Sequence, residues 1–174
     1  MRIRFSEISP NGNRYEFNEL GGIRDQEILS LGHNSKAEVV LVKKSDTQVE
    51  LSGTIKAVPE IICDRCLEPF GYVLETSFHL LFEVSGKNKW RMREVECASE
   101  ELDTIELDEP SIDLIEIIRQ QILLSLPVKK ICSTECKGIC SYCGVNLNTE
   151  SCRCSQQANN SPFAILAEYK KKQK

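Results

Sequence analysis

The sequence lacks the motifs that mark classical enzymes. Its two histidines, His33 and His79, stand in no catalytic pattern, and there is no glycine-rich phosphate loop, Ser-His-Asp arrangement or HExxH motif. His79 falls on the polar face of a predicted strand, where a histidine is typically an ordinary surface residue. We therefore expect a protein that is not an enzyme and that has no small-molecule substrate.

Long apolar segments are also missing. No run of 18 apolar residues occurs, and the longest aliphatic stretches, such as residues 39–42, are too short to span a bilayer. The N-terminus has no apolar segment of the kind found in secretory signals. These absences predict a cytoplasmic protein with no membrane partner, in a reducing compartment where thiols persist and bind metal.

The formal net charge is only −4, but it is unevenly distributed along the chain. Residues 1–119 carry 14 basic and 23 acidic side chains, whereas residues 120–174 carry eight basic and three acidic ones. The basic end of the chain is also its cysteine-rich end. A polyanion such as RNA is therefore expected to bind there.

Cysteine is the residue that the sequence has in excess. Six of the nine cysteines fall within residues 132–154, a segment too small for an apolar core of its own. Such segments fold around either disulfides or a metal ion. Cys140-Ser-Tyr-Cys143-Gly144 has the form of a zinc knuckle, in which glycine lets backbone amides turn toward the sulfurs. Cys152 and Cys154 are the nearest candidates to complete this four-thiolate site, which we call site 1; disulfides are the alternative.

A second CxxC motif, Cys63-Asp-Arg-Cys66, lies between two predicted strands. A structural zinc site needs four ligands, so Cys63 and Cys66 cannot complete one alone. Cys132 and Cys136 are not used by site 1, and together with Cys63 and Cys66 they form a possible second site, which we call site 2. Eight cysteines are then used, and Cys97 is an ordinary thiol. Two alternatives stay open: one zinc ion at site 1 with Cys63 and Cys66 free or redox-active, or a different grouping such as a binuclear site that shares thiolates.

Alternating apolar and polar residues predict an antiparallel sheet with one solvated face. The clearest strands are residues 38–43, 49–57 and 70–84, and weaker ones are residues 3–8 and 15–20. The apolar face of the last long strand consists of Tyr72, Leu74, Phe78, Leu80, Phe82 and Val84. Residues 94–109 contain eight carboxylates and no Lys or Arg, which indicates a solvated loop.

A helix is predicted to begin near Asp113, because Asp113 and Glu116 have the spacing of a capping box. Its face with Ile118 and Ile122 is expected to cover the sheet. Ile117 and Leu124 point nearly the opposite way, and a last helix at residues 163–169 is expected to cover them. Pro127 ends the first helix.

Together these patterns predict an α+β fold: an antiparallel β-sheet or partial barrel with a covering helix and a C-terminal Cys-rich zinc module. We expect one domain at residues 1–109, with the CxxC hairpin and the acidic loop 94–109. The second domain, residues 110–174, would contain the helix, the zinc-binding segment and the basic C-terminal helix.

The residues expected to contact RNA are the cations near the cysteines and at the C-terminus, with one aromatic side chain that can stack on an unpaired base. They are Lys129, Lys130, Lys137, Tyr142, Arg153, Lys170, Lys171, Lys172 and Lys174. For Tyr142, packing inside the knuckle is the equally supported alternative.

Four collinear segments resemble the bacterial YceD family, the large ribosomal RNA subunit accumulation proteins. They are residues 63–70 (CDRCLEPF), 112–127 (IDLIEIIRQQILLSLP), 136–148 (CKGICSYCGVNLN) and 161–167 (SPFAILA). Ser141 departs from the family, whose members often have proline in the knuckle. The resemblance implies a non-enzymatic role in the accumulation of large-subunit (23S) ribosomal RNA, by binding precursor rRNA or an assembly intermediate.

Two other functions compete with this one. The first is a redox-active CxxC protein or redox switch, in which Arg65 lowers the pKa of a thiol. The motif does not open a helix within a βαβ pattern, as a thioredoxin-like site would. The second is a protein–protein adaptor that binds a ribosomal protein through the Ile117/Leu124 stripe and the acidic segment.

Overall fold

The structure, a computed structural model, describes residues 1–23, 25–84 and 104–154. It consists of two compact units. Unit 1 comprises Met1–Ile61 and Phe70–Val128, and unit 2 comprises Ile62–Pro69 and Lys129–Lys174, of which residues 129–154 are described. This differs from the division at residues 109 and 110 expected from the sequence. The helix belongs to the sheet unit because its apolar face is part of the sheet's core, and the first CxxC belongs to the Cys-rich unit because its sulfurs lie there.

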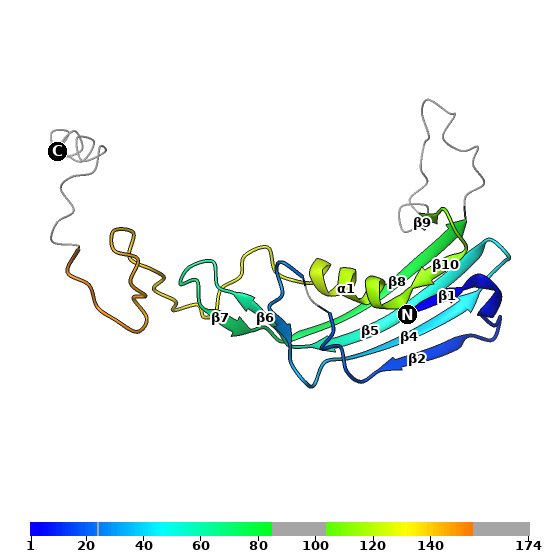
Figure 1. The fold of residues 1–174 in the computed structure, drawn as a ribbon, viewed down its shortest axis with the longest axis horizontal. Coiled ribbons are helices and arrows are strands. Elements are labelled where there is room, and N and C mark those ends of the chain that lie inside the picture. Colours follow the sequence, from blue (N-terminus) through cyan, green and yellow to red (C-terminus); the bar gives the residue numbers. More distant parts are fainter. Residues whose placement is uncertain (24, 85–103, 155–174) are drawn as a thin grey trace, which may run out of the picture. The chain divides into compact units, whose positions relative to one another are not determined.

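The main sheet of unit 1 has the strand order β2-β4-β5-β8-β9 (Figure 1). Its strands are β2 (Asn13–Phe17), β4 (Lys36–Lys43), β5 (Gln48–Ala57), β8 (Leu74–Val84) and β9 (Thr104–Leu107). The pairings from β2 to β8 are antiparallel, as expected, whereas β8 and β9 pair in parallel. The sheet is therefore mixed, within an α+β fold.

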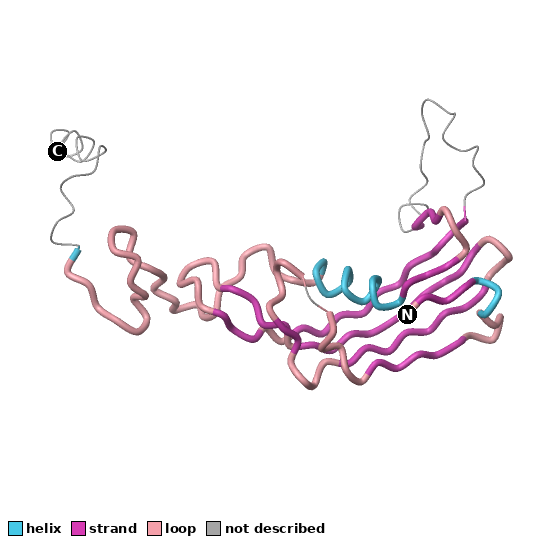
Figure 2. The backbone as a smooth tube through the Cα atoms, in the orientation of Figure 1, coloured by secondary structure: helices cyan, strands magenta, loops and turns pink. Residues whose placement is uncertain are grey.

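Two smaller sheets accompany it (Figure 2). In the first, β1 (Arg2–Arg4) pairs with β10 (Ser111–Asp113), and the short 3₁₀ helix η1 (Phe5–Glu7) follows β1. The second contains β3 (Ser30–Leu31), β6 (Pro59–Ile62) and β7 (Pro69–Gly71) in the order β3-β6-β7. The tip between β6 and β7 carries the first CxxC motif.

The helix α1 (Leu114–Leu124) begins where the sequence predicts it. Asp113 caps it by accepting a hydrogen bond from the Ile115 N–H at 3.2 Å. Ile118 and Ile122 are fully buried in the core that α1 shares with β5 and β8. Leu124, in contrast, is 77% exposed, so it points away from the sheet as the sequence predicted.

The core lies between α1, the β1–β10 pair and one face of the main sheet. Its most deeply buried side chains include Val39, Leu41, Val49, Leu51, Ile55, Phe82, Ile112, Leu114, Ile118 and Ile122. On β5, Gly53 lies opposite Phe78, and a Cβ atom there would come within 2.6 Å of the Phe78 Cζ and 2.9 Å of the Glu38 carbonyl oxygen. Only glycine leaves room for this ring.

Part of the expected acidic loop is a strand, which corrects the prediction for residues 104–107. Ile105 and Leu107 alternate with Glu106, and this segment pairs with the end of β8. The two apolar side chains pack partly against the core, a burial that a solvated loop would not provide. Residues 94–103 lie outside the described residues, as do the last helix expected at 163–169 and the lysines at 170–174. No helix among the described residues is long and apolar enough to cross a membrane.

Candidate metal centre

Eight of the nine cysteines gather in two groups of four within unit 2. Site 1 contains Cys140, Cys143, Cys152 and Cys154, and site 2 contains Cys63, Cys66, Cys132 and Cys136. These are the two groups obtained from the sequence by pairing the leftover cysteines. Cys97 lies outside the described residues.

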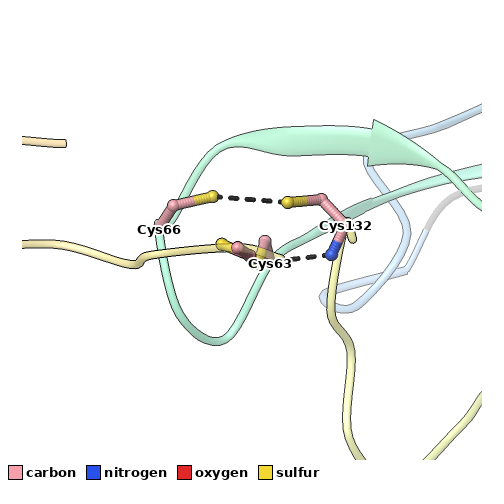
Figure 3. Close-up of side chains that lie close together, drawn as sticks. Cys63, Cys66 and Cys132 are labelled. Atoms are coloured by element: carbon pink, nitrogen blue, oxygen red, sulfur yellow. Dashed lines mark hydrogen bonds between the residues drawn. The ribbon is translucent and has the colours of Figure 1, made fainter. Parts of the chain in front are cut away.

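The sulfur positions in each group suit a single ion. All four sulfurs of a group lie within 4.8 Å of one another. In site 2 the Sγ atoms of Cys63 and Cys136 are 3.9 Å apart, and those of Cys66 and Cys132, which point toward each other in Figure 3, are 3.8 Å apart. A tetrahedron with zinc–sulfur bonds of about 2.3 Å has edges of about 3.8 Å. A disulfide would need about 2.05 Å, and all eight cysteines are free thiols.

Site 2 is built by a loop and by the chain that follows α1. The Cys63 N–H donates to the Glu68 carbonyl at 3.0 Å, and the Leu67 N–H donates to the Cys63 carbonyl at 2.9 Å, which closes the loop. Asp64 then holds the approaching chain twice. Its N–H donates to the Lys130 carbonyl at 2.8 Å, and its carboxylate accepts from the Lys130 N–H at 2.7 Å. This contact positions Cys132 beside the CxxC.

Backbone donors surround the Cys63 sulfur. Burial opposes ionisation of this thiol, but the N–H groups of Cys66, Cys132 and Arg65 outweigh it and lower the pKa of Cys63 to about 6. The Cys132 N–H, 3.4 Å from the Cys63 Sγ, is drawn in Figure 3, and the Arg65 N–H lies at 3.5 Å. These donors stabilise a thiolate, which is the form that binds metal.

Cys132 shows the opposite effect. Its interaction with the Cys136 thiol, together with partial desolvation of its sulfur, raises the pKa of Cys132 to about 12. Four thiolates this close repel one another, so without a cation some of them stay protonated. A divalent ion at the centre would supply the missing positive charge.

Site 1 repeats this arrangement with its own loop. The Cys140 N–H donates to the Val145 carbonyl at 2.8 Å, and the Gly144 N–H donates to the Cys140 carbonyl at 2.9 Å. The backbone N–H groups of Cys143 and Tyr142 are the main cause that lowers the pKa of Cys140 to about 6. The Cys143 thiol is the main cause that raises the pKa of Cys154 to about 12.

The two sites differ in exposure. In site 2, Cys63, Cys66 and Cys136 are buried and Cys132 is exposed. In site 1 only Cys140 is buried, while Cys143 is exposed and the other two are half-buried. Site 2 is therefore the more enclosed of the two.

Two residues support site 2 in roles that the sequence did not predict. The Arg65 guanidinium donates to the Cys136 carbonyl at 3.0 Å, so this side chain holds the backbone of a ligand. The Asn148 side chain accepts from the Lys137 N–H at 2.8 Å and donates to the Cys136 Sγ at 3.5 Å. In the sequence Arg65 was considered only for its effect on a thiol pKa, and Asn148 stood out only as the last residue of the family segment 136–148.

The predicted RNA-contacting residues in the described part of unit 2 are mostly accessible. Lys129, Lys137 and Arg153 are exposed, and Lys130 is half-buried. Tyr142 is 61% exposed, so its ring does not pack inside the knuckle. Lys170, Lys171, Lys172 and Lys174 lie outside the described residues.

The redox hypothesis lacks its usual structural context. Cys63-Asp-Arg-Cys66 lies in a turn between β6 and β7, not at the start of a helix as in thioredoxin-like sites. The Arg65 side chain is directed to a carbonyl oxygen, and it is the Arg65 backbone N–H that contacts the Cys63 sulfur.

The fold and the cysteine groups define a β-sheet protein with a cysteine-rich unit of the kind that holds structural metal. The family model described as "Large ribosomal RNA subunit accumulation protein YceD" matches residues 51–170. This chain belongs to the YceD family, as the four motif segments indicated.

Curated relatives agree with this assignment at modest identity. The chain is 24% identical over 149 residues to the chloroplastic "Large ribosomal RNA subunit accumulation protein YCED homolog 1" of Arabidopsis thaliana, covering 74% of this chain and 46% of the relative. Its Zea mays counterpart is 25% identical over 181 residues, covering 88% and 60%. A protein of Mycobacterium tuberculosis is 27% identical over 126 residues, covering 71% and 58%. The chain thus spans about half the length of the curated relatives it matches. No solved structure matches it significantly.

Proposed function

We propose that this chain is a non-enzymatic, zinc-stabilised factor that supports the accumulation of large-subunit ribosomal RNA. In this proposal unit 2 contacts precursor rRNA or an assembly intermediate in the cytoplasm. Membership of the YceD family supports the process, because the family and its plant relatives are named for it. The observation that carries the mechanism is the pair of four-sulfur groups in a unit with exposed cations.

Zinc is proposed to be structural. Four cysteine ligands fill a tetrahedral site and leave no position for a catalytic water. The described part of unit 2 has few buried apolar side chains, so metal binding would supply most of its folding free energy; structural zinc in small modules contributes on the order of 10–16 kcal/mol. Metal would thereby fix the positions of the cations that meet the RNA.

The cations of unit 2 set the expected strength of RNA binding. Four to six phosphate contacts, from Lys129, Lys130, Lys137, Arg153 and the C-terminal lysines, predict a slope of roughly −3 to −5 for log affinity against log salt on duplex-like RNA. Tyr142 is proposed to stack on an unpaired base, which would add affinity without changing this slope.

The test compares the unsubstituted chain with two triple variants of equal charge change on fragments of large-subunit rRNA. The triple variant Lys129→Ala, Lys137→Ala and Arg153→Ala should reduce the salt slope by roughly 2–3. The control, Arg2→Ala, Lys36→Ala and Lys56→Ala, removes three exposed cations of unit 1 and should leave the slope of the unsubstituted chain. A salt-independent affinity of the unsubstituted chain would remove direct RNA binding from the proposal.

A further inference from the structure

The two CxxC loops share one backbone design that their sequences do not reveal. In each loop the N–H four residues after the first cysteine donates to that cysteine's carbonyl, from Leu67 to Cys63 and from Gly144 to Cys140, both at 2.9 Å. In each loop the first cysteine's N–H donates to the carbonyl five residues on. Leu67 and Gly144 therefore occupy equivalent positions.

This position requires a left-handed backbone. Gly144 has a φ of 75° and Leu67 has a φ of 61°, and Leu67 is the one non-glycine residue with positive φ among the described residues. Glycine adopts this conformation without cost, whereas the Cβ of leucine approaches a carbonyl oxygen. At this position site 2 thus has Leu67 in a strained left-handed conformation, whereas site 1 has Gly144, which adopts that conformation without strain.

The fold does not explain the leucine. Its side chain is 60% exposed and is not part of the hydrophobic core. Strained residues that persist without a packing role are often functional. A single exposed apolar side chain is common on protein surfaces, so it is the combination of exposure with a strained backbone that singles out Leu67.

The charges around Leu67 select the type of partner. Glu68 follows it directly and Asp64 precedes it by three residues; both are exposed, and the Asp64 carboxylate also accepts from the Lys130 N–H. The one cation in the loop, Arg65, is turned toward the Cys136 carbonyl. The loop therefore combines an exposed apolar side chain with two exposed carboxylates, which repel phosphates and suit a surface with Lys or Arg side chains around an apolar pocket.

We propose that Leu67, with the exposed carboxylates of Asp64 and Glu68, is an anchor that docks unit 2 into an apolar pocket on a basic protein of the large ribosomal subunit. The choice of a ribosomal partner rests on the proposed function. The anchor uses other side chains than the cations and Tyr142 that are proposed to meet the RNA, although Asp64 is bonded to the backbone of one of those cations, Lys130.

The test uses the full zinc-loaded chain and two variants, Leu67→Gly and Leu67→Asn. Both new residues tolerate a left-handed backbone, so both variants should fold and their thermal midpoints should match or exceed the unsubstituted value by about a few degrees. The probe is the protein fraction of large ribosomal subunits, extracted free of RNA. Binding to immobilised chain should fall at least about tenfold for both variants. Val73→Asn removes another exposed apolar side chain, 79% exposed in unit 1, and should bind as the unsubstituted chain does.

Three results would overturn the proposal. The first is unchanged binding of the Leu67 variants, or no binding by the unsubstituted chain. The second is a clear fall in the thermal midpoint of both variants, which would make Leu67 a structural residue. The third is a loss of rRNA binding with ribosomal-protein binding intact, which would make the tip an RNA contact. Failure of the proposed RNA function appears instead in the salt slopes of the cation variants, so the two failures are distinguishable.

Discussion

At the scale of single residues, Gly53 gives the sharpest test of the sheet. Gly53→Ala places a Cβ 2.6 Å from the Phe78 ring and 2.9 Å from the Glu38 carbonyl oxygen, so the strands or the ring must move. We expect a loss of about 1–3 kcal/mol in the free energy of unfolding, measured by urea denaturation. Gly21→Ala, where a Cβ meets nothing within 4 Å, is the matched control and should cost nothing. Equal stability of the two variants would contradict the close approach at Gly53.

The lowered pKa of Glu116 leads us to expect that the stability of unit 1 depends weakly on pH. The Arg119 guanidinium, whose Nε donates to the Glu116 carboxylate at 2.9 Å, lowers the pKa of Glu116. Because the pKa of Glu116 is lower in the folded protein than in the unfolded chain, ionisation of this carboxyl stabilises the fold at pH values above its unfolded-state pKa of about 4.3. This stabilisation is lost as the pH falls through the folded-state pKa. Because the pair is partly exposed, Glu116→Gln should cost under about 1 kcal/mol at pH 7.

Urea denaturation of both proteins across pH 3 to 7 checks this expectation. The difference between the unsubstituted chain and Glu116→Gln should shrink toward the acid end. A difference that grows as the pH falls would have the wrong sign.

At the scale of elements, α1 separates a buried face from an exposed one. Ile118→Ala should lower the free energy of unfolding by about 2–5 kcal/mol, because the side chain is fully buried against the sheet. Leu124→Ala, at a site 77% exposed on the same helix, should change it by under about 0.5 kcal/mol. Thermal or urea unfolding followed by circular dichroism measures both, and similar losses would mean that Leu124 is covered in solution.

The elements themselves were largely predictable. Alternation along residues 49–57 and 70–84 predicted the two longest strands, because each has one buried face, although the second is divided into β7, which ends at Gly71, and β8, which begins at Leu74. The Asp113 cap marked the start of α1. The short strand β9 was not predicted, because it has only two apolar residues within a segment rich in carboxylates, and that composition is typical of a solvated loop. Its parallel pairing with β8 depends on a distant partner, which no local pattern contains.

For the candidate metal centre, the ligands could be predicted from the sequence, but the surrounding hydrogen bonds could not. Counting cysteines gave both four-residue groups, because a tetrahedral site needs four ligands and two pairs were left. The equivalence of the two CxxC loops was not visible, since Leu67 stands where a knuckle usually has glycine. The Asn148 hydrogen bond to Cys136 was also hidden, because it joins residues far apart in a loop without periodicity.

At the scale of the whole molecule, the central prediction is metal content. Elemental analysis of the purified chain should find two zinc ions per chain, one for each four-sulfur group. Cys63→Ser with Cys66→Ser should leave one ion and should leave the sheet signal of unit 1 in circular dichroism, because the core of unit 1 contains neither cysteine. A zinc content of two in that double variant, or of zero in the unsubstituted chain, would refute the assignment of the sites.

The two sites differ in how far apart their ligands lie along the chain. Site 1 draws all its cysteines from residues 140–154, whereas in site 2 Cys63 and Cys136 are 73 positions apart. As the polypeptide is synthesised, Cys63 and Cys66 must wait until nearly the entire sheet and α1 have been translated before their partners exist. Loading of site 2 would therefore occur late, and a truncated product that ends within α1 could never acquire that ion. Zinc at site 2 would thus distinguish a chain translated beyond Cys136 from one interrupted before it.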